Sequence, residues 1–235
     1  MKTPFAVTFD FGQVLASFDA NYLTEKLIAR GLTGEASRFE AALPEGWRVY
    51  GESLRKGALA EVAWKELLRV ILEAGAVAAT PELLDDLFRE QKHQNLWRRP
   101  VPGMIELAQE LRAEGVAVGV LSNSEGGILD LLRTLGWENV FAAVADSGVL
   151  GMEKPHAPIF RWTAERLGVP VDALVHIGDS WVADIEGAMG VEARAIWFLE
   201  GIATAPRCLP RNVRFAQNAD DVRAALREFR QSVNE

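Results

Sequence analysis

The feature that most constrains the fold is a regular alternation of short apolar runs and helical patterns, which begins near residue 98. The apolar runs cover residues 116–121, 140–145, 173–177 and 193–198, and the helical patterns between them cover residues 126–135, 156–167 and 181–189. Strands that alternate with helices at this spacing form βαβ units, which bring parallel strands into one sheet. The alternation therefore predicts an α/β fold with a doubly wound, Rossmann-like parallel sheet.

One predicted strand is separated from this sheet by a long helical insertion. Residues 5–9 form an apolar run that ends at Asp10, whereas residues 21–93 carry apolar side chains at helical spacing and almost no strand pattern. Ligands bind at the carboxyl edge of open parallel sheets, and the insertion begins at that edge. We therefore expect a core of residues 1–17 and 98–235, and an all-α cap of residues 18–97 that covers an active site.

Composition excludes several classes of protein. The chain has 235 residues, 49% of them apolar, and a net charge of −8, which excludes a disordered chain and argues against nucleic acid as a partner. The single cysteine, Cys208, excludes a disulfide scaffold and a cysteine-based metal cluster. No stretch approaches the ~20 apolar residues of a membrane span. We expect a cytoplasmic protein without a membrane partner, and the sequence does not indicate its oligomeric state.

Polar residues follow the predicted strands at their carboxyl ends. They are Asp10, Ser122, Asn123, Lys154, Asp179 and Asp184. Carboxylates are the ligands that Mg²⁺ prefers, and a hydroxyl beside backbone N–H groups can hold an anion. A lysine offsets negative charge on a carboxylate or a phosphate. Together these groups suit phosphoryl transfer to an enzyme carboxylate.

Four segments that carry these residues resemble the haloacid dehalogenase-like (HAD) hydrolase superfamily. They read VTFDFGQVL at 7–15, VLSN at 120–123, GMEKP at 151–155 and IGDSWVADIEGA at 177–188. Their order and spacing are similar to those of the family across residues 5–200. The helical insertion directly after the first segment resembles the first cap type of the family.

The resemblance implies a Mg²⁺ site. Asp10 would be a ligand through one carboxylate oxygen, and Gly12 would be a ligand through its backbone carbonyl. Asp179 would bind the ion directly, whereas Asp184 would bind it through water or orient the site.

The resemblance also implies how a small phosphorylated metabolite would react. Asp10 would be the nucleophile and would form an aspartyl-phosphate. Ser122 and Asn123 would hold the phosphate, and Lys154 would keep Asp10 ionised and help to neutralise the transferring group. The expected activity is that of a Mg²⁺-dependent phosphatase, with a sugar phosphate among the candidate substrates.

Position 12 departs from the family pattern. Most phosphatases of the family have a second Asp there, which protonates the leaving group and then activates water; Gly12 can do neither. General acid–base catalysis is typically worth ~10²–10⁴-fold, or about 3–5 kcal/mol of barrier. Some family members with Gly at this position resemble sugar-phosphate phosphatases. Gln13, Ser17, Asp19 or a cap residue are candidates to replace the missing acid.

Other functions stay open. Gly12 is compatible with a regulatory protein that binds a phosphorylated ligand without useful turnover. A phosphonate C–P hydrolase would need an imine-forming lysine from the cap, which offers Lys26, Lys56, Lys65 and Lys92. Hydrolysis of a carbon–halogen bond without a metal is less well supported, because that chemistry has no need for the carboxylates of Asp179 and Asp184. His176, inside an apolar run, is interpreted as a buried core histidine rather than a ligand.

Overall fold

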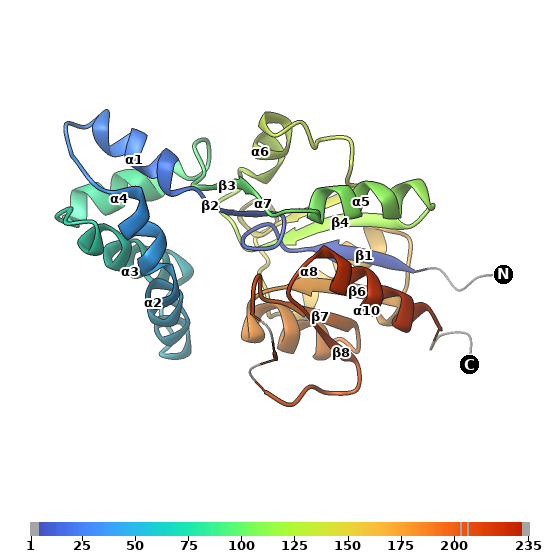
Figure 1. Cartoon of the computed structure of the whole chain (residues 1–235). Helices are drawn as coiled ribbons and strands as arrows, with labels where there is room; N and C mark the ends of the chain where they lie inside the picture. The colour runs from blue at the N-terminus through green and yellow to red at the C-terminus, as the bar shows by residue number, and fades with distance from the viewer. Residues whose placement is uncertain (1–4, 203, 206, 232–235) are drawn as a thin grey trace. The chain divides into compact units, whose positions relative to one another are not determined.

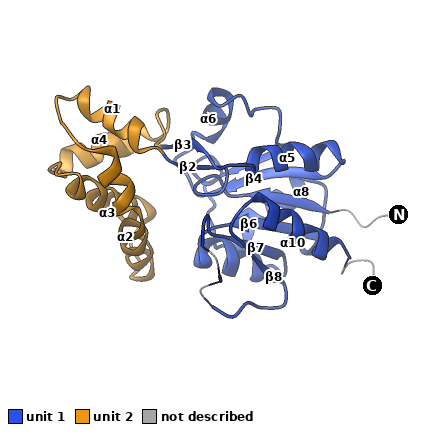
Figure 2. Ribbon diagram, in the orientation of Figure 1, with its two compact units in different colours: residues 1–18, 97–235 blue, residues 19–96 orange. Residues whose placement is uncertain are grey.

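The computed structural model describes residues 5–202, 204, 205 and 207–231. The chain divides into two compact units, which Figures 1 and 2 show. One unit combines the chain up to Phe18 with the chain from Trp97 onward, and the other is Asp19–Leu96. The first unit holds a six-stranded sheet and the second is helical.

The sheet of the first unit is parallel throughout, with the strand order β5-β4-β1-β6-β7-β8. Its strands are β1 (Ala6–Phe9), β4 (Ala117–Ser122), β5 (Ala143–Asp146), β6 (Leu174–Gly178), β7 (Arg194–Phe198) and β8 (Val213–Ala216). The helices of this unit are α5 (Met104–Ala113), α6 (Ile128–Thr134), α7 (Ser147–Leu150), α8 (Ala157–Arg166), η1 (Val171–Ala173), η2 (Trp181–Glu186), α9 (Gly187–Met189) and α10 (Ala219–Gln231). The predicted α/β fold class with a parallel sheet and a helical insertion is confirmed.

The central strands β1 and β6 are buried along their whole length. Parallel strands are covered on both faces, so their sequences are nearly continuous apolar runs. Two buried exceptions are Thr8 in β1 and His176 in β6, which lie opposite each other in the register of the two strands. Polar side chains in this position need hydrogen-bond partners, which the site described below supplies.

The sequence analysis missed a small antiparallel sheet. It pairs β2 (Ala16–Phe18) with β3 (Trp97–Pro100), with Ser17 opposite Arg99. Strands this short are hard to recognise from alternation, and β3 also contains two arginines and a proline. The pair lies where the chain leaves the first unit and where it returns.

The helical unit contains α1 (Ala20–Ile28), α2 (Ala36–Arg55), α3 (Ala60–Ala74) and α4 (Pro81–Glu90). Asp19 caps α1 by accepting a hydrogen bond from Tyr22 N, and Thr80 caps α4 ahead of Pro81. The buried face of α3 packs against α2, and its apolar residues recur at helical spacing. No described helix is both long and apolar enough to cross a membrane.

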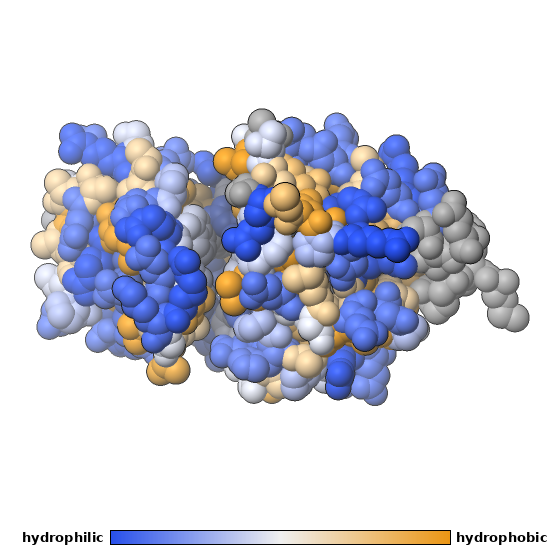
Figure 3. Space-filling view, turned by 90° about the horizontal axis from the view of Figure 1, so that it is seen from below, coloured by the Kyte–Doolittle hydropathy of each residue, from blue (hydrophilic) through white to orange (hydrophobic). Residues whose placement is uncertain are grey.

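Exposed large apolar side chains are scattered over both units. They are Ile28, Leu59, Val62, Leu129, Val149, Val182 and Ile202. Figure 3 shows one face of the molecule, on which hydrophobic residues form small patches among hydrophilic ones. Scattered apolar residues of this kind are normal for a protein surface.

Candidate active site

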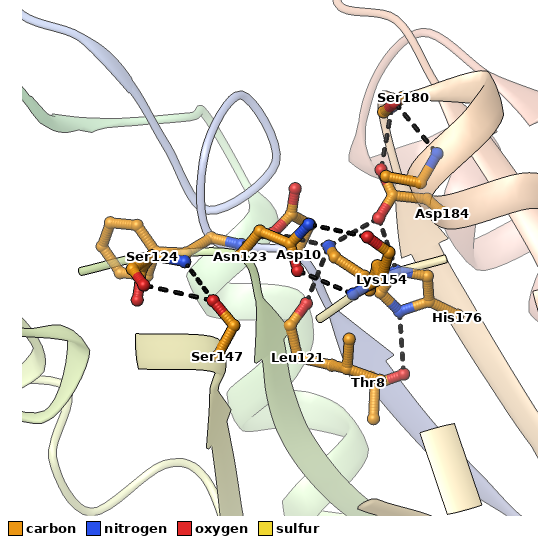
Figure 4. A network of polar contacts seen from close by, with 12 residues as sticks. Thr8, Asp10, Leu121, Asn123, Ser124, Ser147, Lys154, His176, Ser180 and Asp184 are labelled. Carbon is orange, nitrogen blue, oxygen red and sulfur yellow. Dashed lines mark hydrogen bonds and ion pairs between the residues drawn. The ribbon is translucent and has the colours of Figure 1, made fainter. Parts of the chain in front are cut away.

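The predicted site residues of the core unit come from three neighbouring strands and the loops that follow them. Asp10 follows β1, Ser122 ends β4 and Asp179 follows β6. Because β4, β1 and β6 are adjacent in the sheet, their carboxyl ends meet at one edge. Lys154, from the loop before α8, and Asp184, from η2, reach the same place (Figure 4).

Lys154 is the centre of this cluster. Its Nζ lies 3.0 Å from Asp10 Oδ1 and donates to Asp184 Oδ1 at 2.6 Å and to the Leu121 carbonyl at 3.0 Å. An ammonium group has three N–H donors, so each donor has one acceptor. The Lys154 side chain is 2% exposed, which makes these contacts a buried, charge-assisted network.

The protonation of the cluster follows from burial and from neighbouring charge. Burial raises the pKa of Asp10 despite the opposing effects of Lys154 and a hydrogen bond from Ser122. Burial alone would raise the pKa of Asp184 too, but Lys154 and His176 hold it well below its ordinary value. Burial disfavours a charged lysine, yet Asp10 and Asp184 outweigh this and raise the pKa of Lys154. Lys154 and Asp184 are therefore a buried ion pair.

Asp179 adds a carboxylate that Lys154 does not contact. Burial, followed by the negative charges of Asp184 and Asp10, raises the pKa of Asp179 well above its ordinary value. Its main chain is fixed from β7, because Trp197 Nε1 donates to the Asp179 carbonyl at 2.8 Å. When they are ionised, three carboxylates beside one ammonium carry an excess of negative charge.

This carboxylate cluster fits a divalent cation. Asp10, Asp179 and Asp184 each offer an oxygen, and these oxygens lie within 4.8 Å of one another. Oxygen donors of this kind suit hard cations such as Mg²⁺. Asp184 already accepts hydrogen bonds from Lys154, His176 and the Ser180 backbone, so the cation would rely most on the other two carboxylates.

Asn123 clamps the Lys154 loop. Its Nδ2 donates to the Lys154 carbonyl at 3.0 Å, and its Oδ1 accepts from the Lys154 N–H at 2.9 Å. Both ends of the side chain are therefore engaged with the main chain. Any contribution of Asn123 to anion binding would come from its backbone N–H.

A second network, which the sequence analysis did not identify, fixes the loop after β4. Asp146 Oδ1 accepts from Ser124 Oγ at 2.6 Å, and its Oδ2 accepts from Ile128 N at 3.0 Å. Ser147 Oγ accepts from Ser124 N at 2.9 Å. In the same loop, burial raises the pKa of Glu125 to about 7. The available signal was Asp146 at the end of β5 followed by Ser147 at the start of α7, since Asp and Ser side chains often form hydrogen bonds to nearby backbone groups.

The loop after Asp10 has room for a Cβ at position 12. A Cβ added to Gly12 would lie 3.5 Å from Trp97 Cδ1, an ordinary van der Waals contact. Of the residues considered as replacements for the missing acid, Ser17 is bonded to Arg99, and Asp19 caps α1 in the helical unit. Gln13 is half-buried and has a left-handed backbone with φ of 59°, which is unusual for a residue with a side chain.

The four cap lysines lie in two kinds of environment. Lys26 is buried, pairs with Glu90 at 2.6 Å and donates to Gln94 at 2.7 Å. Lys65 pairs with Glu61 and with Asp85. The side chains of the other two, Lys56 and Lys92, are exposed.

The chain is similar to known proteins in sequence and in fold. The sequence model of the haloacid dehalogenase-like hydrolases matches residues 6–190. The chain is 26% identical over 177 residues to haloacid dehalogenase-like hydrolase domain-containing protein 3 of Mus musculus, covering 71% of this chain and 69% of that protein. It is 30% identical over 173 residues to phosphoserine phosphatase of Thermus thermophilus, covering 69% of this chain and 66% of that enzyme.

Shorter and structural similarities point the same way. Glyceraldehyde 3-phosphate phosphatase of Methanopyrus kandleri is 36% identical over 91 residues, which cover 38% of this chain and 39% of that enzyme. A putative HAD-hydrolase from Bacillus subtilis, bound to magnesium in its crystal structure, superposes with a TM-score of 0.73 at 18% identity, covering 96% of this chain and 99% of that one. At that identity the structural similarity concerns the fold.

Proposed function

The chain belongs to the haloacid dehalogenase-like hydrolases, and we propose that it is a Mg²⁺-dependent phosphatase of a small phosphorylated metabolite. One observation carries the proposal: Lys154 Nζ bridges Asp10 and Asp184 within a cluster of three buried or half-buried carboxylates. The named phosphatases among its relatives act on phosphoserine and glyceraldehyde 3-phosphate, which are small phosphate monoesters.

In this proposal Asp10 is the nucleophile. A carboxylate oxygen of Asp10 attacks phosphorus, the bond from phosphorus to the leaving oxygen breaks, and an aspartyl-phosphate forms. Water then attacks phosphorus, releasing inorganic phosphate and the Asp10 carboxylate. Lys154 neutralises charge beside Asp10 throughout, and the Ser122 hydroxyl donates to an oxygen of the transferring phosphate.

The proposed metal ligands are Asp10, the Gly12 carbonyl and Asp179, with Asp184 acting through water or by orienting the others. Burial, and then the charges of Asp184 and Asp10, raise the pKa of Asp179, and this supports the set because a bound cation would stabilise its charged form. Bound Mg²⁺ would neutralise the phosphate oxygens and position them for in-line attack. The magnesium-bound Bacillus subtilis relative supports the choice of ion.

Gly12 narrows the substrate class. Without a second Asp, the departing oxygen leaves unprotonated, which favours phosphates with good leaving groups such as acyl and anomeric sugar phosphates. The space at Gly12 supports a direct test, because a Cβ added there would make only ordinary van der Waals contacts.

The test is hydrolysis of p-nitrophenyl phosphate and of an alkyl phosphate by wild type, Asp10→Asn, Gly12→Asp and Gly12→Asn. We expect wild-type turnover of the aryl phosphate that requires both Mg²⁺ and Asp10. Gly12→Asp should raise kcat/KM on the alkyl phosphate by ~10²-fold or more, because general acid–base catalysis is worth ~10²–10⁴-fold. Gly12→Asn adds a similar volume without an acid and should give no such gain. Turnover by Asp10→Asn at the wild-type rate would refute the nucleophile assignment.

A second candidate is a protein that binds a phosphorylated ligand without useful turnover, which Gly12 favours. It predicts binding of inorganic phosphate by calorimetry, no hydrolysis by wild type and no gain from Gly12→Asp. A C–P hydrolase is less well supported, since Lys26 and Lys65 are engaged in ion pairs. Absence of borohydride trapping with phosphonoacetaldehyde would dismiss it.

A further inference from the structure

His176 lies in the buried strand β6, and both of its ring nitrogens have polar partners (Figure 4). Its Nε2 lies 2.9 Å from Asp184 Oδ1, and its Nδ1 lies 3.0 Å from Thr8 Oγ1. All three side chains are fully buried. A strand position like this one requires only an apolar side chain, and a buried polar group is costly unless it is hydrogen-bonded. The contacts therefore indicate a role beyond packing.

We propose that His176 is a positioning residue. It holds the Asp184 carboxylate in place and, through that carboxylate, keeps the Lys154 ammonium beside Asp10. The inference rests on the proposed function, because it assigns a role toward that same cluster. It differs from the interpretation of His176 as a core histidine only, although the ring also packs edge-on against Phe160, with ring centroids 5.5 Å apart.

The proton positions follow from what each partner can offer. Asp184 is ionised beside Lys154, and a carboxylate can only accept hydrogen bonds. His176 Nε2 therefore carries a proton and donates it to Asp184 Oδ1. In the neutral ring Nδ1 is then an acceptor, and the Thr8 hydroxyl donates to it. Thr8 thus satisfies the second ring nitrogen and holds the ring in the orientation that Asp184 needs, in the way that an outer partner fixes a metal-binding histidine.

Three donors hold the Asp184 carboxylate. Oδ1 accepts from Lys154 and His176, and Oδ2 accepts from the Ser180 backbone at 2.8 Å. The carboxylate lies directly over β6, because a Cβ added to Gly178 would come within 2.1 Å of Asp184 Cγ. Without the His176 N–H, Asp184 Oδ1 would accept a hydrogen bond from Lys154 alone. The carboxylate could then turn, and Lys154 would follow it away from Asp10.

The experiment compares His176→Leu, His176→Gln and Thr8→Val with wild type. Leucine fills the space without a donor, whereas the glutamine amide can still donate to Asp184. Thr163→Val is the matched control for Thr8→Val, because Thr163 is also fully buried but bonds the Ile159 carbonyl within α8. Isothermal titration calorimetry with Mg²⁺ measures binding, and p-nitrophenyl phosphate kinetics separate kcat from KM.

Ring ¹⁵N NMR adds a readout that is independent of the metal. The chain has three histidines, and the other two, His93 and His156, are exposed. The buried ring should show a protonated Nε2 and an unprotonated Nδ1, and Thr8→Val should shift the Nδ1 resonance.

We expect His176→Leu to weaken Mg²⁺ binding by ~10–100-fold and to lower kcat more than it changes KM, as is typical for outer-shell partners. His176→Gln should recover most of both, and Thr163→Val should match wild type. If the His176→Leu variant folds and both its Mg²⁺ affinity and its kcat stay within twofold of wild type, the inference is overturned. If His176→Leu does not fold, Thr8→Val becomes the test. Mg²⁺ affinity and kcat equal to those of Thr163→Val would then overturn the inference. A wild type that neither binds Mg²⁺ nor turns over would refute the proposed function first, and this inference with it.

Discussion

Replacing Lys154 by methionine removes the ammonium group that contacts both Asp10 and Asp184. Methionine has a similar length and an apolar stem, so packing is largely kept while the ammonium is lost. The Asp184 side chain is 0% exposed, so water cannot replace the lost partner there, and the Asp10 side chain is only 13% exposed. Two buried negative charges would then face each other.

The size of the effect follows from this burial. Breaking a buried ion pair by removing one partner costs ~3–5 kcal/mol of unfolding free energy. For a chain of this size, 1 kcal/mol shifts Tm by ~2–4 °C, so Lys154→Met should lower Tm by ~6–20 °C. Lys65→Met is the matched control, because Lys65 also contacts two carboxylates but in a partly exposed setting. Exposed pairs are worth ~0–1 kcal/mol, which corresponds to ~4 °C or less.

Differential scanning calorimetry without added metal measures the Tm of wild type and of both variants. The pH dependence gives a second check, with its sign fixed by the pKa shifts. The pKa of Asp184 is lowered from 3.8 and that of Lys154 is raised from 10.5, so the pair stabilises the folded protein fully between about pH 4 and 10. The Tm deficit of Lys154→Met should therefore be largest in this window and shrink as the pH falls below about 4. A deficit equal to that of Lys65→Met at pH 7 would refute the reasoning.

Three further outcomes are expected. Asp179→Asn should raise the Tm of the metal-free protein at pH 7 and abolish its stabilisation by Mg²⁺, because the raised pKa of Asp179 means that its charged form is disfavoured there; an unchanged melt would contradict this. Glu125 has a pKa of about 7 against 4.5 ordinarily, so its charge destabilises the folded protein increasingly from pH 4.5 to 7. Glu125→Gln should raise the free energy of unfolding by at most about 3 kcal/mol at pH 8 and by almost nothing at pH 4, as measured by urea unfolding. Asn123→Ala should cost ~1–3 kcal/mol and lower kcat, since it releases both main-chain bonds of the Lys154 loop.

Much of the fold was predictable because local patterns and sheet geometry agree. The central parallel strands β1, β4 and β6 are almost entirely buried, so they read as apolar runs, and a helix follows β4 and β6 along the chain. The β2–β3 pair was not predictable in the same way. Ser17 and Arg99 are 82 residues apart, and their pairing depends on where the helical insertion returns to the core unit. Nothing local in three or four residues specifies such a contact.

The candidate site was also predictable only in part. Asp10, Ser122 and Asp179 follow or end strands, and the ends of neighbouring parallel strands meet by geometry alone. The contact of His176 with Asp184 could not be predicted, because it depends on the wide π-helical turn of η2. The sequence analysis expected one regular helix over residues 181–189, whereas the structure has a π-helix at Trp181–Glu186 followed by α9. This turn lets the Ser180 backbone bond Asp184, which brings its carboxylate back over β6.

The bonds of Lys154 bear on the missing acid at Gly12. Its three donors are committed to Asp10, Asp184 and the Leu121 carbonyl, and its pKa is raised, so it holds its proton rather than delivering it to a leaving group. Ser17 is also engaged, within the β2–β3 pair. Under the proposed function, the groups around Asp10 would form and neutralise a phosphoenzyme, but neither Lys154 nor Ser17 would protonate a departing alkoxide. Under the proposed function, the barrier should rise with the basicity of the leaving group. Selection among phosphate esters would then depend on this chemistry as much as on the shape of the substrate.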